Sequence, residues 1–132
     1  MKRIKTFLCQ YWPTLIVIGL ILYATLSSDP TGDVSIEIPH LDKLIHAIMM
    51  GGLVGAIAFD YKRAERQRQL TFRFMSTVAA YVMVACIADE LAQAYLTDSR
   101  SGDVLDLLAD WAGVWVAVFT APPAVNRVLR RR

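Results

Sequence analysis

The residues best suited to chemistry are acids placed inside an apolar stretch near the end of the chain. Asp103, Asp106 and Asp110 fall within an arc of about 60° at 100° per residue, so one face of a helix would carry all three. An ionised carboxylate inside a membrane costs about 2.5 to 3.5 kcal/mol, so it is normally paired, protonated or in contact with water. Acids in such a register can bind a cation, receive a basic group or transfer a proton.

Two other segments carry ionisable groups near this acidic face. Asp42 and His46 stand at i and i+4, one above the other, and Lys43 precedes His46 by three positions. Glu90 lies near the end of another apolar stretch, and Arg100 follows it with a guanidinium suited to bidentate contacts with phosphate or carboxylate. The candidate binding residues are Asp42, Lys43, His46, Glu90, Gln93, Arg100, Asp106 and Asp110.

The elements that must position these groups are transmembrane helices. The chain has 132 residues, of which 55% are hydrophobic, and a mean hydropathy of +0.40. Four stretches approach the roughly 20 apolar residues needed to cross a bilayer. The first is expected to be retained as a helix rather than cleaved as a signal peptide. We predict a single all-α domain, 1–132, forming a bundle of four transmembrane helices over about residues 7–26, 41–60, 70–95 and 103–121.

The orientation of the bundle follows from the segregation of its charges. The net charge is only +2, yet the basic residues gather at both termini and in the loop between the second and third helices. The positive-inside rule therefore predicts a multi-pass protein of a bacterial plasma membrane with both termini in the cytoplasm. The other two loops are acidic, which places the polar cluster on the outer side. We interpret the basic loop as a topology signal in contact with membrane lipids, and expect no nucleic-acid partner.

Small residues predict where the helices approach one another. Gly51 and Gly55 form a G-x-x-x-G pair, and Gly113 and Ala117 continue the acidic face of the last helix. In lipid, such residues let backbones come close. The glycine pair could also support a homo-oligomer.

Two segments also resemble a known family. "IPHLDKLIHAIMMGGL" and "DELAQAYLTDSRSGDVLDLLADWAG" are similar to VanZ-like membrane proteins, whose pattern has D-K-x-x-H on the second helix and E-x-x-Q at the end of the third. It then has R-x-x-x-x-x-D-x-x-x-N-x-x-G leading into the fourth. The match runs from about Ile38 into the fourth helix and places the candidate binding residues on this pattern. The resemblance implies a small polytopic membrane fold and a role in low-level resistance to glycopeptide antibiotics such as teicoplanin.

One position departs from this pattern. Asp110 stands where the family usually has Asn. An acid at this depth must be protonated or balanced by Lys43, Arg100, a protonated His46 or a bound cation, whereas an amide need not be.

Three interpretations of the polar cluster remain open. It is an outward-facing pocket that binds or handles an envelope lipid, a wall precursor or an amphiphilic antibiotic; a membrane-embedded hydrolase or transferase; or a structural network. A hydrolase or transferase would use Glu90 or Asp110 beside His46, but no nucleophile elbow, H-E-x-x-H motif or phosphate-binding glycine loop supports it. We expect a binding site rather than an enzyme, with no redox or organic cofactor and no dedicated metal site, although the acids could hold a divalent cation.

Overall fold

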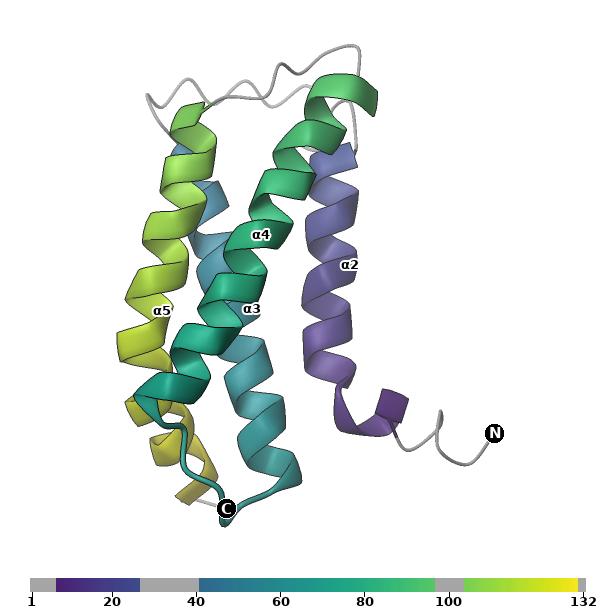
Figure 1. Cartoon of the computed structure of the whole chain (residues 1–132). Coiled ribbons are helices and arrows are strands. Elements are labelled where there is room, and N and C mark those ends of the chain that lie inside the picture. The colour runs from purple at the N-terminus through teal and green to yellow at the C-terminus, as the bar shows by residue number, and fades with distance from the viewer. Residues whose placement is uncertain (1–6, 27–40, 97–103, 131–132) are drawn as a thin grey trace.

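The computed structural model describes residues 7–26, 41–96 and 104–130 and shows a bundle of helices. A helical turn at residues 7–10 leads into α2 (Trp12–Leu26), which is followed by α3 (Leu41–Ala64), α4 (Phe72–Leu96) and α5 (Val104–Arg130). Successive helices run in opposite directions, so α2 and α4 begin at one end of the bundle and α3 and α5 begin at the other (Figure 1). This arrangement confirms the predicted all-α bundle.

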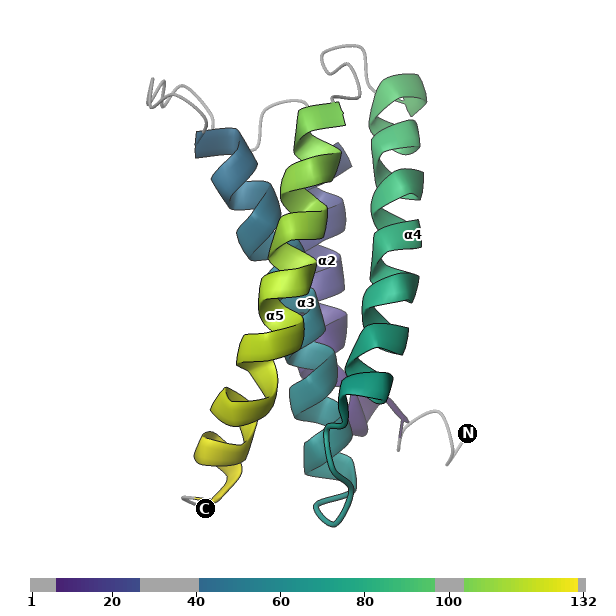
Figure 2. The same ribbon diagram turned by 60° about the vertical axis from the view of Figure 1, so that its left-hand side comes forward.

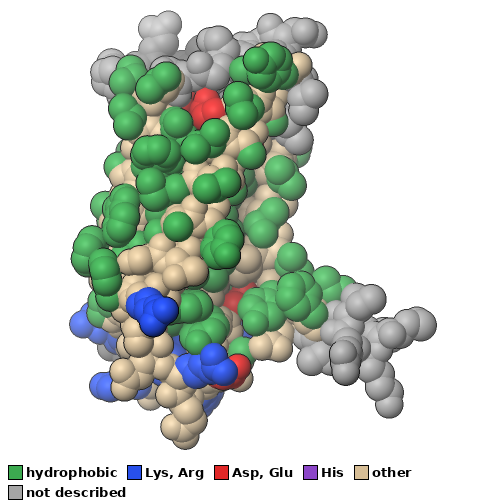
Figure 3. Space-filling view, viewed as in Figure 1, with side chains coloured by type: hydrophobic (Ala, Val, Ile, Leu, Met, Phe, Trp, Pro, Cys, Tyr) green, Lys and Arg blue, Asp and Glu red, His purple; other side chains and the backbone are tan. Residues whose placement is uncertain are grey.

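The lengths and composition of the helices suit a membrane. Within the described residues, α3, the Phe72–Ala92 part of α4 and α5 are long and apolar enough to cross a bilayer. The α2 helix is also apolar but has only 15 residues. Hydrophobic side chains cover the middle of the bundle, whereas Lys and Arg side chains gather toward the lower end (Figure 3). The chain is therefore a membrane protein whose middle is apolar and whose Lys and Arg side chains gather at one end of the bundle.

The two ends of the bundle differ in charge. We call the acidic end the one where α3 and α5 begin and α4 ends; its described acids are Asp42, Asp89, Glu90, Asp106 and Asp110. We call the basic end the opposite one, where the link between α3 and α4 lies; its described cations include Lys62, Arg63, Arg66, Arg68, Arg73, Arg127 and Arg130.

The core lies along α3, which packs against α5 over much of its length and also contacts α2 and α4. A bundle in lipid is held by close packing rather than by water exclusion, so small and medium side chains dominate the contacts. The buried core residues are Ile21, Met50, Leu53, Val54, Ala58, Met75, Ala79, Val82, Cys86, Val114, Ala117, Val118, Ala121 and Val125.

The last helix is longer than the sequence predicts. It was expected to end near residue 121, before Pro122 and Pro123, but α5 continues to Arg130 as one helix (Figure 2). Prolines are tolerated in membrane helices when neighbouring groups satisfy the freed carbonyls. Here Val125 is buried against the core, and Arg127 and Arg130 lie in the last turn, where cations favour the helix dipole.

The first helix begins later than predicted. The chain bends at Tyr11, and α2 then starts at Trp12 rather than continuing unbroken from residue 7. Pro13 accounts for this, because a proline fits the first turn of a helix but cannot donate to the turn before it.

Candidate functional site

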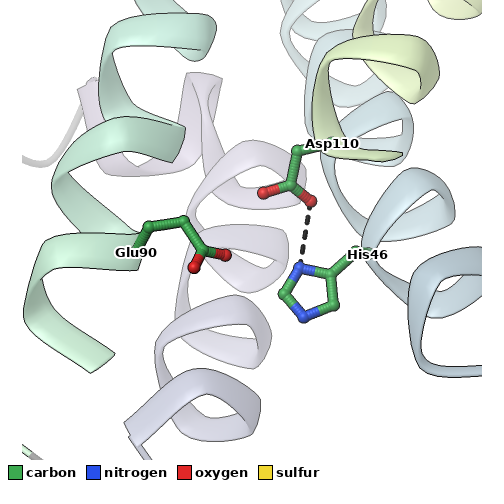
Figure 4. Close-up of side chains that lie close together, drawn as sticks. All are labelled: His46, Glu90 and Asp110. Carbon is green, nitrogen blue, oxygen red and sulfur yellow. Dashed lines mark hydrogen bonds and ion pairs between the residues drawn. The ribbon is translucent and has the colours of Figure 1, made fainter. Parts of the chain in front are cut away.

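Three helices bring one ionisable side chain each to a common point inside the acidic end. His46 comes from α3, Glu90 from α4 and Asp110 from α5, and their side chains point toward one another (Figure 4). His46 Nδ1 lies 3.1 Å from Asp110 Oδ1. One donor atom from each of the three residues lies within 4.8 Å of the others. We call these three residues the inner triad.

The inner triad is removed from solvent. Asp110 is fully buried, and His46 and Glu90 are only 7% and 8% exposed. Oδ1 of Asp110 contacts His46, but no described residue donates a hydrogen bond to the buried Oδ2. Two carboxyl groups and one imidazole therefore share a space in which an unbalanced charge is costly.

A second layer of charge lies one helical turn nearer the acidic end. Lys43 Nζ donates to Asp106 Oδ1 at 2.9 Å and to Asp42 Oδ2 at 3.1 Å. The side chains of Lys43 and Asp106 remain 22% and 17% exposed, whereas that of Asp42 is 60% exposed. We call Asp42, Lys43 and Asp106 the rim.

Helical spacing stacks the rim on the inner triad. Lys43 precedes His46 by three residues on α3, and Asp106 precedes Asp110 by four residues on α5. Residues at these spacings share one helix face, so the Lys43–Asp106 contact and the His46–Asp110 contact follow one another between the same two helices. Charge thus runs inward from an exposed carboxylate to a fully buried one.

A close backbone contact positions α3 against α5 beside the triad. A Cβ built on Gly113 would lie 2.0 Å from the carbonyl oxygen of Ala47, and one built on Gly51 would lie 2.8 Å from the carbonyl oxygen of Gly113. Real side chains do not approach backbone this closely, so both positions require glycine. Ala47 is the residue after His46, and Gly113 lies three residues after Asp110. The contact between the two backbones therefore fixes the distance between His46 and Asp110.

The structure brings together most of the residues predicted from the sequence. Asp42, Lys43 and Asp106 form the rim, and His46, Glu90 and Asp110 form the inner triad. Arg100 and the side chain of Gln93 lie outside the described residues, so their predicted contacts stay predictions.

The helix contacts differ in one respect from those predicted from the small residues. Gly113 lies at the close contact and Ala117 is buried in the core, as their place on the acidic face predicts. A Cβ at Gly55, by contrast, would meet no atom within 4 Å. The G-x-x-x-G pair therefore does not act as a unit in this bundle: Gly51 alone packs against α5.

Two hollows of the described surface are lined by residues outside the polar cluster. One of about 450 Å³ lies at the basic end and is lined by Lys62, Arg66, Gln67, Gln69, Leu70, Asn126, Leu129 and Arg130. At the acidic end, the rim is the solvent-accessible part of the polar cluster, and the inner triad is enclosed behind it.

The sequence did not reveal a third buried carboxylate, near the basic end. Asp60 is fully buried, and its Oδ2 accepts hydrogen bonds from the backbone N–H of Thr14 at 3.0 Å and from the Thr14 hydroxyl at 2.7 Å. Its Oδ1 lies 3.2 Å from the guanidinium of Arg63. Arg63 in turn donates to the carbonyl of Gln10 at 2.5 Å and lies over the ring of Trp12. Asp60 thus caps the start of α2, and Arg63 holds the bend before it.

One signal could have pointed to this anchor. Asp60 interrupts an aromatic and apolar run three residues before Arg63, a spacing that allows an ion pair within one helix. Its partner Thr14 is 46 residues away, and no local pattern joins the two.

The chemistry open to the inner triad is that of paired acids and an imidazole. The His46–Asp110 contact orients the imidazole, as a carboxylate does for a general base, and Glu90 offers a second proton acceptor within reach. The same three groups supply one nitrogen and two oxygen donors, a set that could hold a metal ion.

Comparison with known proteins gives a family match over nearly the whole chain. A family model described as VanZ/LLP1 matches residues 3–126. No curated protein and no solved structure was found to match the chain.

Proposed function

This chain belongs to the VanZ/LLP1 family, and from that premise we propose that it binds or handles an amphiphilic molecule of the bacterial cell envelope. The ligand is an envelope lipid, a lipid-linked wall precursor or a glycopeptide-type antibiotic, and the role resembles that of proteins that give low-level teicoplanin resistance. The binding site is the polar cluster of the acidic end.

The observation that carries this proposal is the layered arrangement of the cluster. Ionisable groups from three separate helices converge, and their exposure falls from 60% for the Asp42 side chain to zero for that of Asp110. A structural network would satisfy its buried oxygens, but Oδ2 of Asp110 receives no hydrogen bond from the described residues. A cluster that is open at the rim and unsatisfied within is better suited to receiving a ligand.

The orientation of the site is part of the proposal. The basic end carries the cations that the positive-inside rule retains in the cytoplasm, so the acidic end faces outward in a bacterial plasma membrane. An amphiphile in the outer leaflet would then meet the rim with its headgroup. Its apolar part would lie along exposed hydrophobic side chains of the same end, such as Leu44, Ile48 and Leu105.

The rim offers charges of both signs to a headgroup. Lys43, shared between two carboxylates, can turn to a phosphate or carboxylate of the ligand, while Asp42 and Asp106 can receive an amino group. Arg100 is proposed as a second cation for the anionic group. Each exchange replaces an existing ion pair, so binding depends on matching charges rather than on burial alone.

The first test replaces rim residues in cells. In a strain that lacks this protein, the wild-type gene should raise the concentration of teicoplanin, or of another envelope-directed agent, needed to stop growth. Lys43→Met and Asp106→Asn should lose this effect while their abundance in the membrane stays unchanged. Glu65→Gln, a change in an exposed pair at the basic end, should behave as the wild type.

Two results would count against the binding site. Loss of membrane abundance in both rim variants would assign the cluster a structural role. Full activity of both variants at normal abundance would show that the rim charges are not used.

A second function is favoured by one specific contact. The 3.1 Å approach of His46 to Asp110, with Glu90 nearby, suits a general acid–base pair in a membrane hydrolase or transferase. Purified protein incubated with phosphorylated lipid carriers should then release phosphate or a headgroup, and His46→Gln should abolish the release. Absence of turnover by the wild-type protein, together with measurable binding of the lipid, would favour the binder.

A further inference from the structure

We propose that the inner triad is a binding site for a divalent first-row transition-metal ion, with Zn²⁺ as the fitting representative. His46 supplies the imidazole nitrogen, and Glu90 and Asp110 supply one carboxylate oxygen each. This site goes beyond the proposed function, because an ion can be held here whatever the rim binds.

The distances permit coordination with small side-chain movements. A zinc ion lies about 2.0 to 2.2 Å from nitrogen and oxygen donors, which places neighbouring donors roughly 3.0 to 3.5 Å apart. His46 Nδ1 and Asp110 Oδ1 are already 3.1 Å apart, and one Glu90 oxygen lies within 4.8 Å of a donor atom of each of these two residues. A movement of the Glu90 side chain toward the other two donors would complete the site.

Burial and charge provide the second, independent observation. Asp110 is fully buried and its Oδ2 is unsatisfied among the described residues. The described cation closest to the triad in the chain, Lys43, already contacts Asp42 and Asp106 in the rim. A divalent ion would balance the fully buried Asp110 carboxylate where water cannot solvate it.

The donor set selects the class of ion. Imidazole with carboxylates suits Zn²⁺, Mn²⁺, Co²⁺ and Fe²⁺, whereas Ca²⁺ requires six to eight oxygen donors and Mg²⁺ keeps several waters in a near-ideal octahedron. The inner triad supplies one nitrogen and two carboxylate oxygen donors from the described residues. Three protein donors leave one tetrahedral position for a further ligand, as in zinc sites that act on a bound molecule.

The backbone contact between α3 and α5 makes the site rigid. Gly113 and Ala47 hold the helices that carry Asp110 and His46 at one separation, so two of the three donors keep their spacing without the ion. A preorganised site of this kind needs little ordering when an ion binds.

The test uses full-length protein purified in detergent without a polyhistidine tag and stripped with a chelator. A calorimetric titration with Zn²⁺ alone should give about one ion per chain. Elemental analysis of the protein after gel filtration should give the same ratio. His46→Gln, Glu90→Gln and Asp110→Asn should each weaken Zn²⁺ binding by more than about 100-fold, because changes even beyond the direct ligands cost 10- to 100-fold. Asp106→Asn, a rim change on the same helix face, should retain binding within about tenfold.

A measurement on the wild-type protein keeps the proposal testable if a variant fails to fold. Co²⁺ added to the stripped protein should give visible absorption bands of a four- or five-coordinate ion with nitrogen and oxygen donors, and equimolar Zn²⁺ should abolish them. Mg²⁺ and Ca²⁺ should leave the bands unchanged.

The outcomes separate this site from the proposed function. Wild-type protein that retains no Zn²⁺ and gives no Co²⁺ bands overturns the metal site, as does Zn²⁺ binding that survives all three inner changes. Neither result bears on the rim, whose test is growth of the Lys43→Met and Asp106→Asn strains. The site is supported if the folded inner variants lose Zn²⁺ while the wild-type protein and Asp106→Asn retain it.

Discussion

Replacing Gly113 by alanine should destabilise the bundle more than any other single-methyl change described here. The added Cβ would stand 2.0 Å from the Ala47 carbonyl oxygen and 2.6 Å from its carbon. Because these are backbone atoms of α3, they cannot rotate away, and the two helices must separate. Overpacking typically costs about 1 to 3 kcal/mol, and a backbone clash lies at or above the upper end. Thermal unfolding in detergent should shift downward by about 10 °C.

Gly55→Ala is the matched control for this change. It lies on α3, the helix that Gly113 of α5 contacts, and its added Cβ meets no atom within 4 Å. Alanine favours a helix over glycine by up to about 1 kcal/mol, so this variant should unfold at the wild-type temperature or slightly above it. Equal unfolding temperatures for the two variants would disprove the close contact between α3 and α5.

Removing the Asp60 carboxylate should be comparably damaging at the other end of the bundle. Asp60→Ala leaves the Thr14 amide and hydroxyl without their acceptor and the Arg63 guanidinium without its counter-charge. Leaving the buried donors of Thr14 without an acceptor costs about 1 to 3 kcal/mol, and the Arg63 side chain, which is 30% exposed, also loses its counter-charge. The start of α2 should detach from α3, which limited proteolysis near the Tyr11 bend and thermal unfolding would both report.

Two further variants define what is lost. Asp60→Asn keeps an oxygen for Thr14 but not the charge opposite Arg63, so it should fall between Asp60→Ala and the wild type. Glu65→Ala, five residues after Asp60, breaks an exposed pair with Arg68 and should leave unfolding unchanged. If Asp60→Ala were as stable as Glu65→Ala, the contacts of Asp60 would not be what holds the start of α2.

The sequence predicted the helices and the face of the polar cluster because both depend on local periodicity. Apolar stretches set the approximate spans, and the i, i+4 spacing of Asp106 and Asp110 placed them on one side of α5. The cost of an isolated charge in a membrane predicted that each acid is paired, protonated or in contact with water. In the structure, donor atoms of His46, Glu90 and Asp110 lie within 4.8 Å of one another.

Other features depend on the relative placement of helices, which no local pattern contains. Spacing alone could not decide whether Gly51 or Gly55 meets α5, since that depends on where the helices cross. The depth of Asp60 was missed because its partner lies on the first helix, and a carboxylate near an arginine-rich loop is expected in solvent. The end of α5 was placed too early because its apolar stretch ends near residue 121, whereas the helix continues through Pro122 and Pro123 to Arg130.

The contact between Gly113 and Ala47 has a mechanical consequence for the two layers of charge. It acts as a pivot between α3 and α5, and at 1.5 Å per residue Asp110 lies about 4.5 Å from it along the axis, whereas Asp106 lies about 10.5 Å away. For any scissor-like opening of the two helices, displacement grows with the lever arm. In such an opening, the Lys43–Asp106 pair would separate more than twice as far as the His46–Asp110 pair. The rim could therefore open for a ligand while the inner triad keeps its geometry.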